Sequence, residues 1–208
     1  VVINLAAQAG VRYSIKNPRT YIENNIDGFF NILECSRIYK IKHLIYASTS
    51  SVYGDSNNFP LIETSNTDKP LSFYAATKKC NEILAYSFSN IYKLNTTGLR
   101  FFTVYGPFGR PDMSLFKFTE SLIKSKEIEL FNKGNHVRDF SYVEDISIAI
   151  EKLLRKPPKT KVPYQIFNIA SDNPYKLKEF LKIIEKNVGK KFKIKELPLQ
   201  KADVIKTH

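Results

Sequence analysis

The chain has 208 residues, 43% hydrophobic and 25% charged, which is ordinary for a globular protein of one sizeable domain or of one domain and part of another. No apolar run approaches the roughly 18 residues of a membrane span, and no secretory signal pattern opens the chain. The formal net charge of +12 is typical of nucleic-acid-binding proteins. However, 25 of the 32 basic residues are lysines scattered along the chain. This pattern favours a solvated lysine surface, or an anionic small-molecule ligand, over a nucleic-acid partner.

Strand-like and helical apolar patterns alternate along the sequence. Strands are predicted at 1–7, 43–48, 96–102, 128–131 and 164–170, and helices at 19–39, 73–93, 114–126, 143–154 and 176–189. The alternation predicts an α/β fold with a doubly wound parallel sheet. Ligands of such sheets bind outside the carboxyl ends of the strands. In this chain the loops that follow the strands are rich in small and hydroxyl residues, as a loop pressed against a ligand requires.

The cysteines and the chain start give two further expectations. Cys35 and Cys80 lie in helical patterns without metal-ligand spacing, so we expect small buried free thiols in a reducing cytoplasm and no metal site. The chain opens directly in a buried-strand pattern, and its one methionine is Met113. We therefore expect a fragment that lacks N-terminal residues.

The stretch YAATKK (74–79) places Tyr74 and Lys78 one helical turn apart on the same helix face. Random placement of 12 tyrosines and 25 lysines yields about one to two such pairs, so the spacing alone is a weak signal. A tyrosine pKa near 10 must fall by about 3 units, or about 4 kcal/mol, for the phenol to act as a base near neutral pH. A lysine ammonium beside the phenol is expected to supply part of that change.

Six stretches occur in a fixed order: NLAA (4–7), ENNIDG (23–28), YASTSSVYG (46–54), YAATK (74–78), RFFTVYGPFGRPDM (100–113) and VRDFSYVEDI (137–146). With this combination the chain resembles the extended short-chain dehydrogenase/reductase superfamily, in particular NAD-dependent nucleotide-sugar 4-epimerases. The residues of these stretches are most similar to those of UDP-glucuronate 4-epimerases. No G-x-x-G-x-x-G turn is present in the sequence, so the pyrophosphate loop and the acidic ribose contact are expected in the missing segment.

The resemblance implies a Rossmann-like NAD-binding domain at 1–102 and 135–170, incomplete at its N-terminus. It also implies part of a smaller substrate-binding domain at 103–134 and 171–208. A homodimer is expected for the full-length protein, with neither a nucleic acid nor a membrane as partner.

The resemblance also implies roles for individual residues. Tyr74 is the catalytic base, Lys78 is its cationic neighbour, and the Thr49 hydroxyl hydrogen-bonds the reacting sugar oxygen. Asn24 matches a buried helix asparagine that helps to hold the lysine. The residues implied to contact NAD are Ala6, Ala7, Gln8, Asn24, Ala47, Ser48, Tyr74, Lys78, Phe101 and Pro107.

The residues implied to contact a UDP-sugar are Ser50, Ser51, Thr103, Arg110 and Arg138. Arg138 matches an arginine that grips the diphosphate; a surface ion pair with Asp139 or Glu144 is the alternative. Thr103 and Arg110 match positions that face the substituent at C5 of the sugar. An arginine at that position fits a carboxylate, which favours a uronic acid.

Ser50 and Ser51 stand where related 4,6-dehydratases and decarboxylases carry carboxylates. Elimination and decarboxylation therefore lack their proton-handling groups, and C4 epimerisation of UDP-glucuronate through a 4-keto intermediate, with NAD as cofactor, is expected. Two alternatives stay open. One is a 4-epimerase of an N-acetylated UDP-sugar or of a neutral UDP-hexose, and the other is a non-catalytic NAD-fold binding protein.

Overall fold

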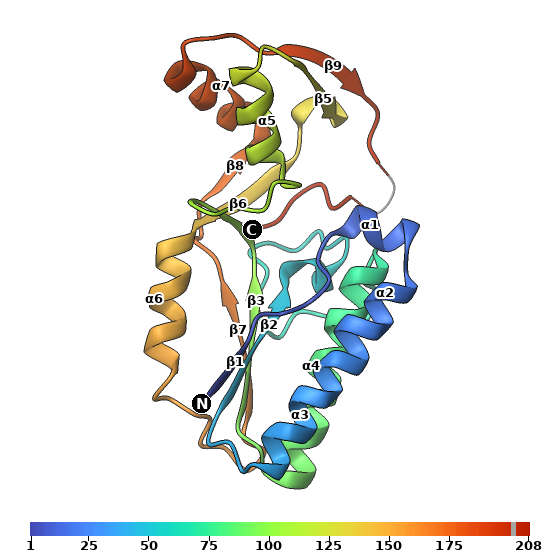
Figure 1. The fold of residues 1–208 in the computed structure, drawn as a ribbon, viewed down its shortest axis with the longest axis vertical. Coiled ribbons are helices and arrows are strands. Elements are labelled where there is room, and N and C mark those ends of the chain that lie inside the picture. Colours follow the sequence, from blue (N-terminus) through green and yellow to red (C-terminus); the bar gives the residue numbers. More distant parts are fainter. Residues whose placement is uncertain (201–202) are drawn as a thin grey trace.

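Four parallel strands form the central sheet, in the order β1-β2-β3-β7 (Figure 1). In the computed structural model, which describes residues 1–200 and 203–208, these are β1 (Val2–Asn4), β2 (Leu44–Thr49), β3 (Thr96–Phe101) and β7 (Tyr164–Ile169). Most residues of β2 and β3 are buried on both sides. This explains why these strands are continuous in apolar or small residues rather than alternating.

Helices cover both faces of this sheet. On one face lie α1 (Val11–Lys16), α2 (Arg19–Tyr21), the π-helical turn η1 (Ile22–Asp27), α3 (Gly28–Ile38) and α4 (Phe73–Tyr92). On the opposite face lies α6 (Val143–Leu153) (Figure 1). The doubly wound α/β fold expected from the sequence is confirmed.

The short 3₁₀ turn η2 (Ser50–Tyr53) follows β2, and the other elements form a second lobe beyond the carboxyl ends of the strands (Figure 1). Its strands are β4 (Thr103–Tyr105), β6 (Val137–Tyr142) and β8 (Pro174–Lys176) in one sheet, and β5 (Glu127–Phe131) and β9 (Lys193–Leu197) in another. Its helices are α5 (Ser114–Ile123), α7 (Leu177–Val188) and the short 3₁₀ turn η3 (Asn132–Gly134). Because β6 pairs with β4 and β8, residues 137–142 belong to the sheet of this lobe. The division into two functional domains stays a prediction.

Gly98 allows the central sheet to pack tightly. A Cβ atom at this position of β3 would lie 2.7 Å from the hydroxyl oxygen of Tyr46, whose ring is fully buried in the core. The glycine therefore lets a tyrosine side chain cross its strand, and the core around Phe29, Leu33 and Phe88 closes over it.

The expectation of two buried thiols is wrong. Both cysteines are free, but Cys35 is exposed on the outer side of α3 and Cys80 is half-buried on α4. Both helices leave apolar residues uncovered, so an apolar neighbourhood in the sequence did not imply burial. Within residues 1–200 and 203–208, no helix is long and apolar enough to cross a membrane, and no cluster of residues has the make-up of a metal site.

Candidate active site

A cavity of about 910 Å³ lies between α1 and the second lobe, next to the segments that follow β1 and β3. Its walls come from α1, from the loop after β4, and from α5, β5 and β6. Three of the residues predicted to contact a substrate line it, namely Thr103, Arg110 and Arg138. The cavity is therefore at the edge of the sheet where the sequence predicts a ligand.

Tyr74 lies in the first turn of α4, next to the end of β2. The helix begins after Ser72, whose hydroxyl accepts a hydrogen bond from the Ala75 backbone N–H at 3.1 Å. Burial raises the pKa of Tyr74, while the Thr49 hydroxyl and the Arg110 guanidinium act in the opposite direction. Three separate segments of the chain thus meet at one phenol.

Lys78 is the second predicted catalytic residue on α4. Its side chain is only 3% exposed, and its ammonium makes no hydrogen bond or ion pair with the part of the chain that the structure describes. Burial lowers the pKa of Lys78 to about 8, against the opposing charge of Glu82. Among the groups that oppose the burial effect on the pKa of Tyr74, the cation is Arg110; the role of Lys78 beside the phenol stays a prediction.

The buried helix asparagine is Asn25, and the prediction of Asn24 is wrong. Asn24 is exposed and donates back to the carbonyl oxygen of Thr20 at 2.8 Å. Asn25 is 1% exposed and bonds both backbone groups of Gln8, at 2.7 and 3.0 Å, and the Thr77 hydroxyl at 3.0 Å. The π-helical turn is the physical reason, because its extra residue per turn rotates the following position inward.

Tyr21 is a site residue that the sequence analysis missed. Its hydroxyl oxygen lies 2.9 Å from the carbonyl oxygen of Ala9 and 2.5 Å from that of Gly10. Its ring meets the Tyr74 ring edge-on, with centroids 6.2 Å apart. The signal available in the sequence is the spacing of four residues between Tyr21 and Asn25, which marks one inward face.

Arg110 forms an ion pair with Asp112 that the sequence analysis also missed. Nε of Arg110 donates to Oδ1 of Asp112 at 2.9 Å, and Nη2 donates to Oδ2. The pair raises the pKa of Arg110 and lowers that of Asp112. Gly10, which lies beside this pair, has a φ of +107°, a backbone conformation that residues with a side chain rarely adopt.

Arg138 donates to backbone carbonyl oxygens of Val137, Val204 and Ile205. Burial lowers its pKa to about 10, with Asp203 opposing. The alternative is wrong, because Arg138 forms an ion pair with neither Asp139 nor Glu144. The Asp139 carboxylate accepts hydrogen bonds from Ser171 and Asn173 instead.

The other predicted residues are spread around the same edge of the sheet. Ala6, Ala7 and Pro107 are exposed, and Ala47, Phe101, Ser50 and Ser51 are half-buried. The Ser48 hydroxyl donates to the buried carboxylate of Glu82 at 2.6 Å. The roles in ligand binding assigned to these residues stay predictions.

The chain is similar to a known protein family and to curated proteins that span nearly its whole length. The model of the NAD dependent epimerase/dehydratase family matches residues 1–170. Protein CapI of Staphylococcus aureus is 52% identical over 222 residues, covering 100% of this chain and 66% of its own length. The UDP-glucuronate 4-epimerase of Thermodesulfobacterium geofontis is 43% identical over 204 residues, covering 98% of this chain and 61% of its own length.

A solved structure has the same fold. The UDP-glucuronic acid 4-epimerase of Bacillus cereus, in complex with UDP-glucuronic acid and NAD, superposes with a TM-score of 0.92 at 30% identity, covering 100% of this chain and 66% of that one. The chain thus spans 61–66% of the length of these three relatives. A match over the whole central sheet and its crossover helices makes this chain a member of the NAD dependent epimerase/dehydratase family.

Proposed function

We propose that the full-length protein is an NAD-dependent 4-epimerase of a UDP-sugar and that its substrate is UDP-glucuronate. The observation that carries the proposal is the meeting of Thr49 and Arg110 at the Tyr74 phenol. A hydroxyl, a cation and a proton-transfer group in one place suit the removal of a proton from a sugar alcohol next to an anionic substituent. The names of the relatives support the same substrate.

The residues present fit NAD. Lys78 is only 3% exposed and its ammonium has no protein acceptor in the described chain, so it can donate to a ligand oxygen or to water. Lys78, with the backbone of residues 6–8 that Asn25 fixes, would hold the cofactor. When bound, NAD supplies a hydride acceptor and donor at C4 of the sugar.

The chain's own residues handle the proton. Tyr74 takes the proton of the 4-hydroxyl group, and Thr49 holds the oxygen in place by a hydrogen bond. Burial alone opposes this step because it raises the pKa of Tyr74. The positive charge of Arg110 partly offsets that effect. Ser50 and Ser51 carry no charge and leave the protons at C5 and C6 without a general base, which favours epimerisation over elimination.

The direct test is conversion of UDP-glucuronate to UDP-galacturonate by the full-length protein, measured after chromatographic separation of the substrate from the product. Faster conversion of UDP-glucose or of an N-acetylated UDP-sugar would establish the alternative substrate class. Binding without conversion of any of these would establish a non-catalytic binding protein.

We expect Arg110→Met to reduce selectivity for the uronate. Loss of a charged hydrogen bond costs about 1.5–3 kcal/mol, so the ratio of kcat/KM for UDP-glucuronate to that for UDP-glucose is expected to fall by roughly 10- to 150-fold. The ratio is the relevant measurement, because Arg110 also acts on Tyr74 and both substrates slow down. Arg19→Met is the matched control, since Arg19 forms an exposed ion pair with Glu23. An unchanged ratio would show that Arg110 does not contact the carboxylate.

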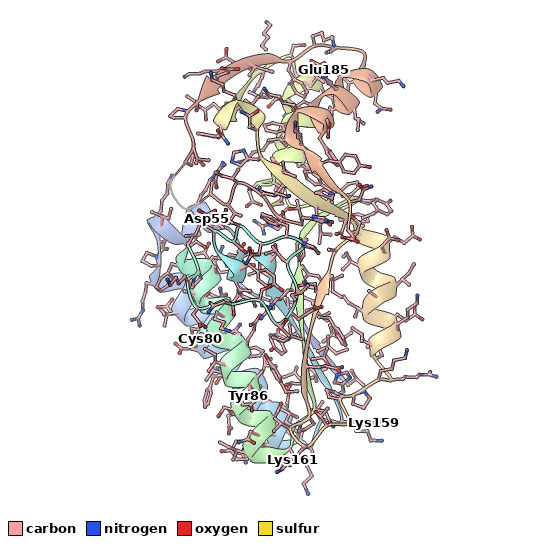
Figure 2. All side chains as sticks on the ribbon, turned by 180° about the vertical axis from the view of Figure 1, so that it is seen from behind. Asp55, Cys80, Tyr86, Lys159, Lys161 and Glu185 are labelled. Carbon is pink, nitrogen blue, oxygen red and sulfur yellow. The ribbon has the colours of Figure 1, made fainter. Side chains whose placement is uncertain are left out.

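The proposal includes a homodimer formed through α3 and α4. Large apolar side chains on these neighbouring helices are exposed: Phe30, Ile38 and Tyr39 on α3, and Ile83, Tyr86 and Ile91 on α4. Figure 2 shows α4 from the side on which Cys80 and Tyr86 lie. Exposed apolar residues gathered on adjacent helices are typical of a subunit interface. The same proposal places the enzyme in the cytoplasm, where free thiols stay reduced.

Ile83→Glu is expected to convert the dimer into a monomer, because it buries a charge at the centre of that interface. Light scattering coupled to size-exclusion chromatography measures the mass. Ile148→Glu on α6, where the isoleucine is 42% exposed, is the control and is expected to leave the mass unchanged. A dimer that persists in Ile83→Glu would exclude this interface.

A further inference from the structure

His136 is a buried histidine in the wall of the cavity, and the proposed chemistry does not use it. It directly precedes β6, its side chain is 6% exposed, and its backbone carbonyl oxygen accepts from the Leu177 N–H at 2.8 Å. Nε2 of its ring has no hydrogen-bond partner among the described residues. The nearest acidic group is Oδ2 of Asp203 at 3.7 Å, which is beyond hydrogen-bond length. A buried polar atom without a partner needs a physical explanation.

The charged groups that face His136 come from three segments. Arg138 lies two residues along on β6, Arg12 comes from α1, and Asp203 comes from the C-terminal segment. Burial lowers the pKa of His136, Arg138 and Arg12 lower it further, and Asp203 opposes them. Without a ligand the imidazole is therefore neutral near pH 7. The two guanidinium groups against one carboxylate leave this part of the wall positively charged.

Arg12 joins the two lobes at this place. Its guanidinium lies 4.9 Å from the ring centroid of Phe131 on β5 and 3.6 Å from Oδ2 of Asp203. Arg138 holds the segment that follows Asp203 through its bonds to the carbonyl oxygens of Val204 and Ile205. The positions of these groups around the His136 ring are thus set by the fold.

We propose that His136 binds the diphosphate of the nucleotide sugar beside Arg138 and takes up a proton from solvent as it does so. The inference rests on the proposed function, because it needs a nucleotide diphosphate in this cavity. Two phosphate charges next to an imidazole favour its protonated form, in which Nε2 donates a charge-assisted hydrogen bond. Affinity then rises as the pH falls through the pKa of the bound form and levels off below the pKa of the free form.

Isothermal titration calorimetry of the full-length protein with UDP-glucose at pH 6 and pH 8 tests this. UDP-glucose is a suitable probe, since its diphosphate has no terminal phosphate that titrates in this range. A pKa rise of about one unit on binding makes the wild type severalfold tighter at pH 6 than at pH 8, about tenfold being the limit reached only below both pKa values, and two buffers of different ionisation enthalpy report the proton uptake. His136→Gln keeps a neutral hydrogen-bonding side chain and is expected to lose both the pH dependence and the uptake.

His208→Gln is the matched control and is expected to behave as the wild type, since its ring pairs with the exposed Asp172 at 3.0 Å. Thermal denaturation checks that each variant is folded, and His136→Asn serves as a second neutral substitution. The inference is overturned, and the proposed function stands, if His136→Gln and His136→Asn bind UDP-glucose with the wild-type pH dependence of affinity while the enzyme still converts UDP-glucuronate. A wild type that binds no UDP-sugar at either pH overturns both.

Discussion

Tyr74→Phe is expected to lower kcat for UDP-glucuronate by about 10²- to 10⁴-fold, the range that a positioned acid–base group contributes. The substitution removes only the phenolic oxygen, and the edge-on contact with the Tyr21 ring is kept. The free energy of unfolding is therefore expected to change little. The measurement is the rate of interconversion at saturating substrate, together with a denaturant titration of the same preparation.

Tyr39→Phe on α3 is the matched control, because the Tyr39 side chain is 77% exposed and lies away from the cavity. Its kcat is expected to equal that of the wild type. Turnover by Tyr74→Phe at the wild-type rate would show that another group accepts the proton. It would also remove the main support for an epimerase and leave the non-catalytic alternative.

The second large effect concerns a buried ion pair below the catalytic residues. Arg100 on β3 donates two hydrogen bonds of 2.9 Å to the carboxylate of Glu82 on α4, and both side chains are at most 4% exposed. Nη1 of Arg100 also donates to the Tyr53 hydroxyl at 2.9 Å, and the Ser48 hydroxyl donates to Glu82. Burial lowers the pKa of Arg100, but the hydrogen bonds and charge of Glu82 outweigh it and raise it.

Glu82→Gln is expected to destabilise the protein by about 3–5 kcal/mol, because it leaves the Arg100 guanidinium buried without its counter-charge. Urea denaturation followed by circular dichroism measures the change. Glu34→Gln is the control, since Glu34 forms a more exposed ion pair with Arg37, and a change below about 1 kcal/mol is expected there. Equal effects of the two substitutions would show that burial does not set the energy of the Glu82 pair.

The order of motifs along the chain was sufficient to predict the central sheet and the region of the site. Strands β2 and β3 are nearly continuous in buried residues, and this pattern does not depend on partners far along the chain. The strands β4, β6, β8 and β9 were missed for the opposite reason. Each has three to six residues and is defined by pairing in the second lobe, which the local sequence does not encode.

The side-chain pairs of the site show where a sequence prediction ends. Thr49 and Tyr74 were predicted together because both lie in stretches that carry the family resemblance, 46–54 and 74–78. Glu82 and Arg100 lie 18 positions apart in a helix and a strand, so neither gives a local sign that they meet inside the protein. Asn25 was missed because prediction from a 3.6-residue period cannot detect a π-helical turn.

The π-helical turn η1 also limits which changes of length the protein tolerates. Within Ile22–Asp27 the turn already holds one residue more than an α-helical turn, so inserting another would turn Phe29 and Leu33 of α3 by about 100° away from the core. Substitutions in this segment can be absorbed one at a time, but a one-codon insertion cannot. Its length, as much as its composition, is what selection on this protein must preserve.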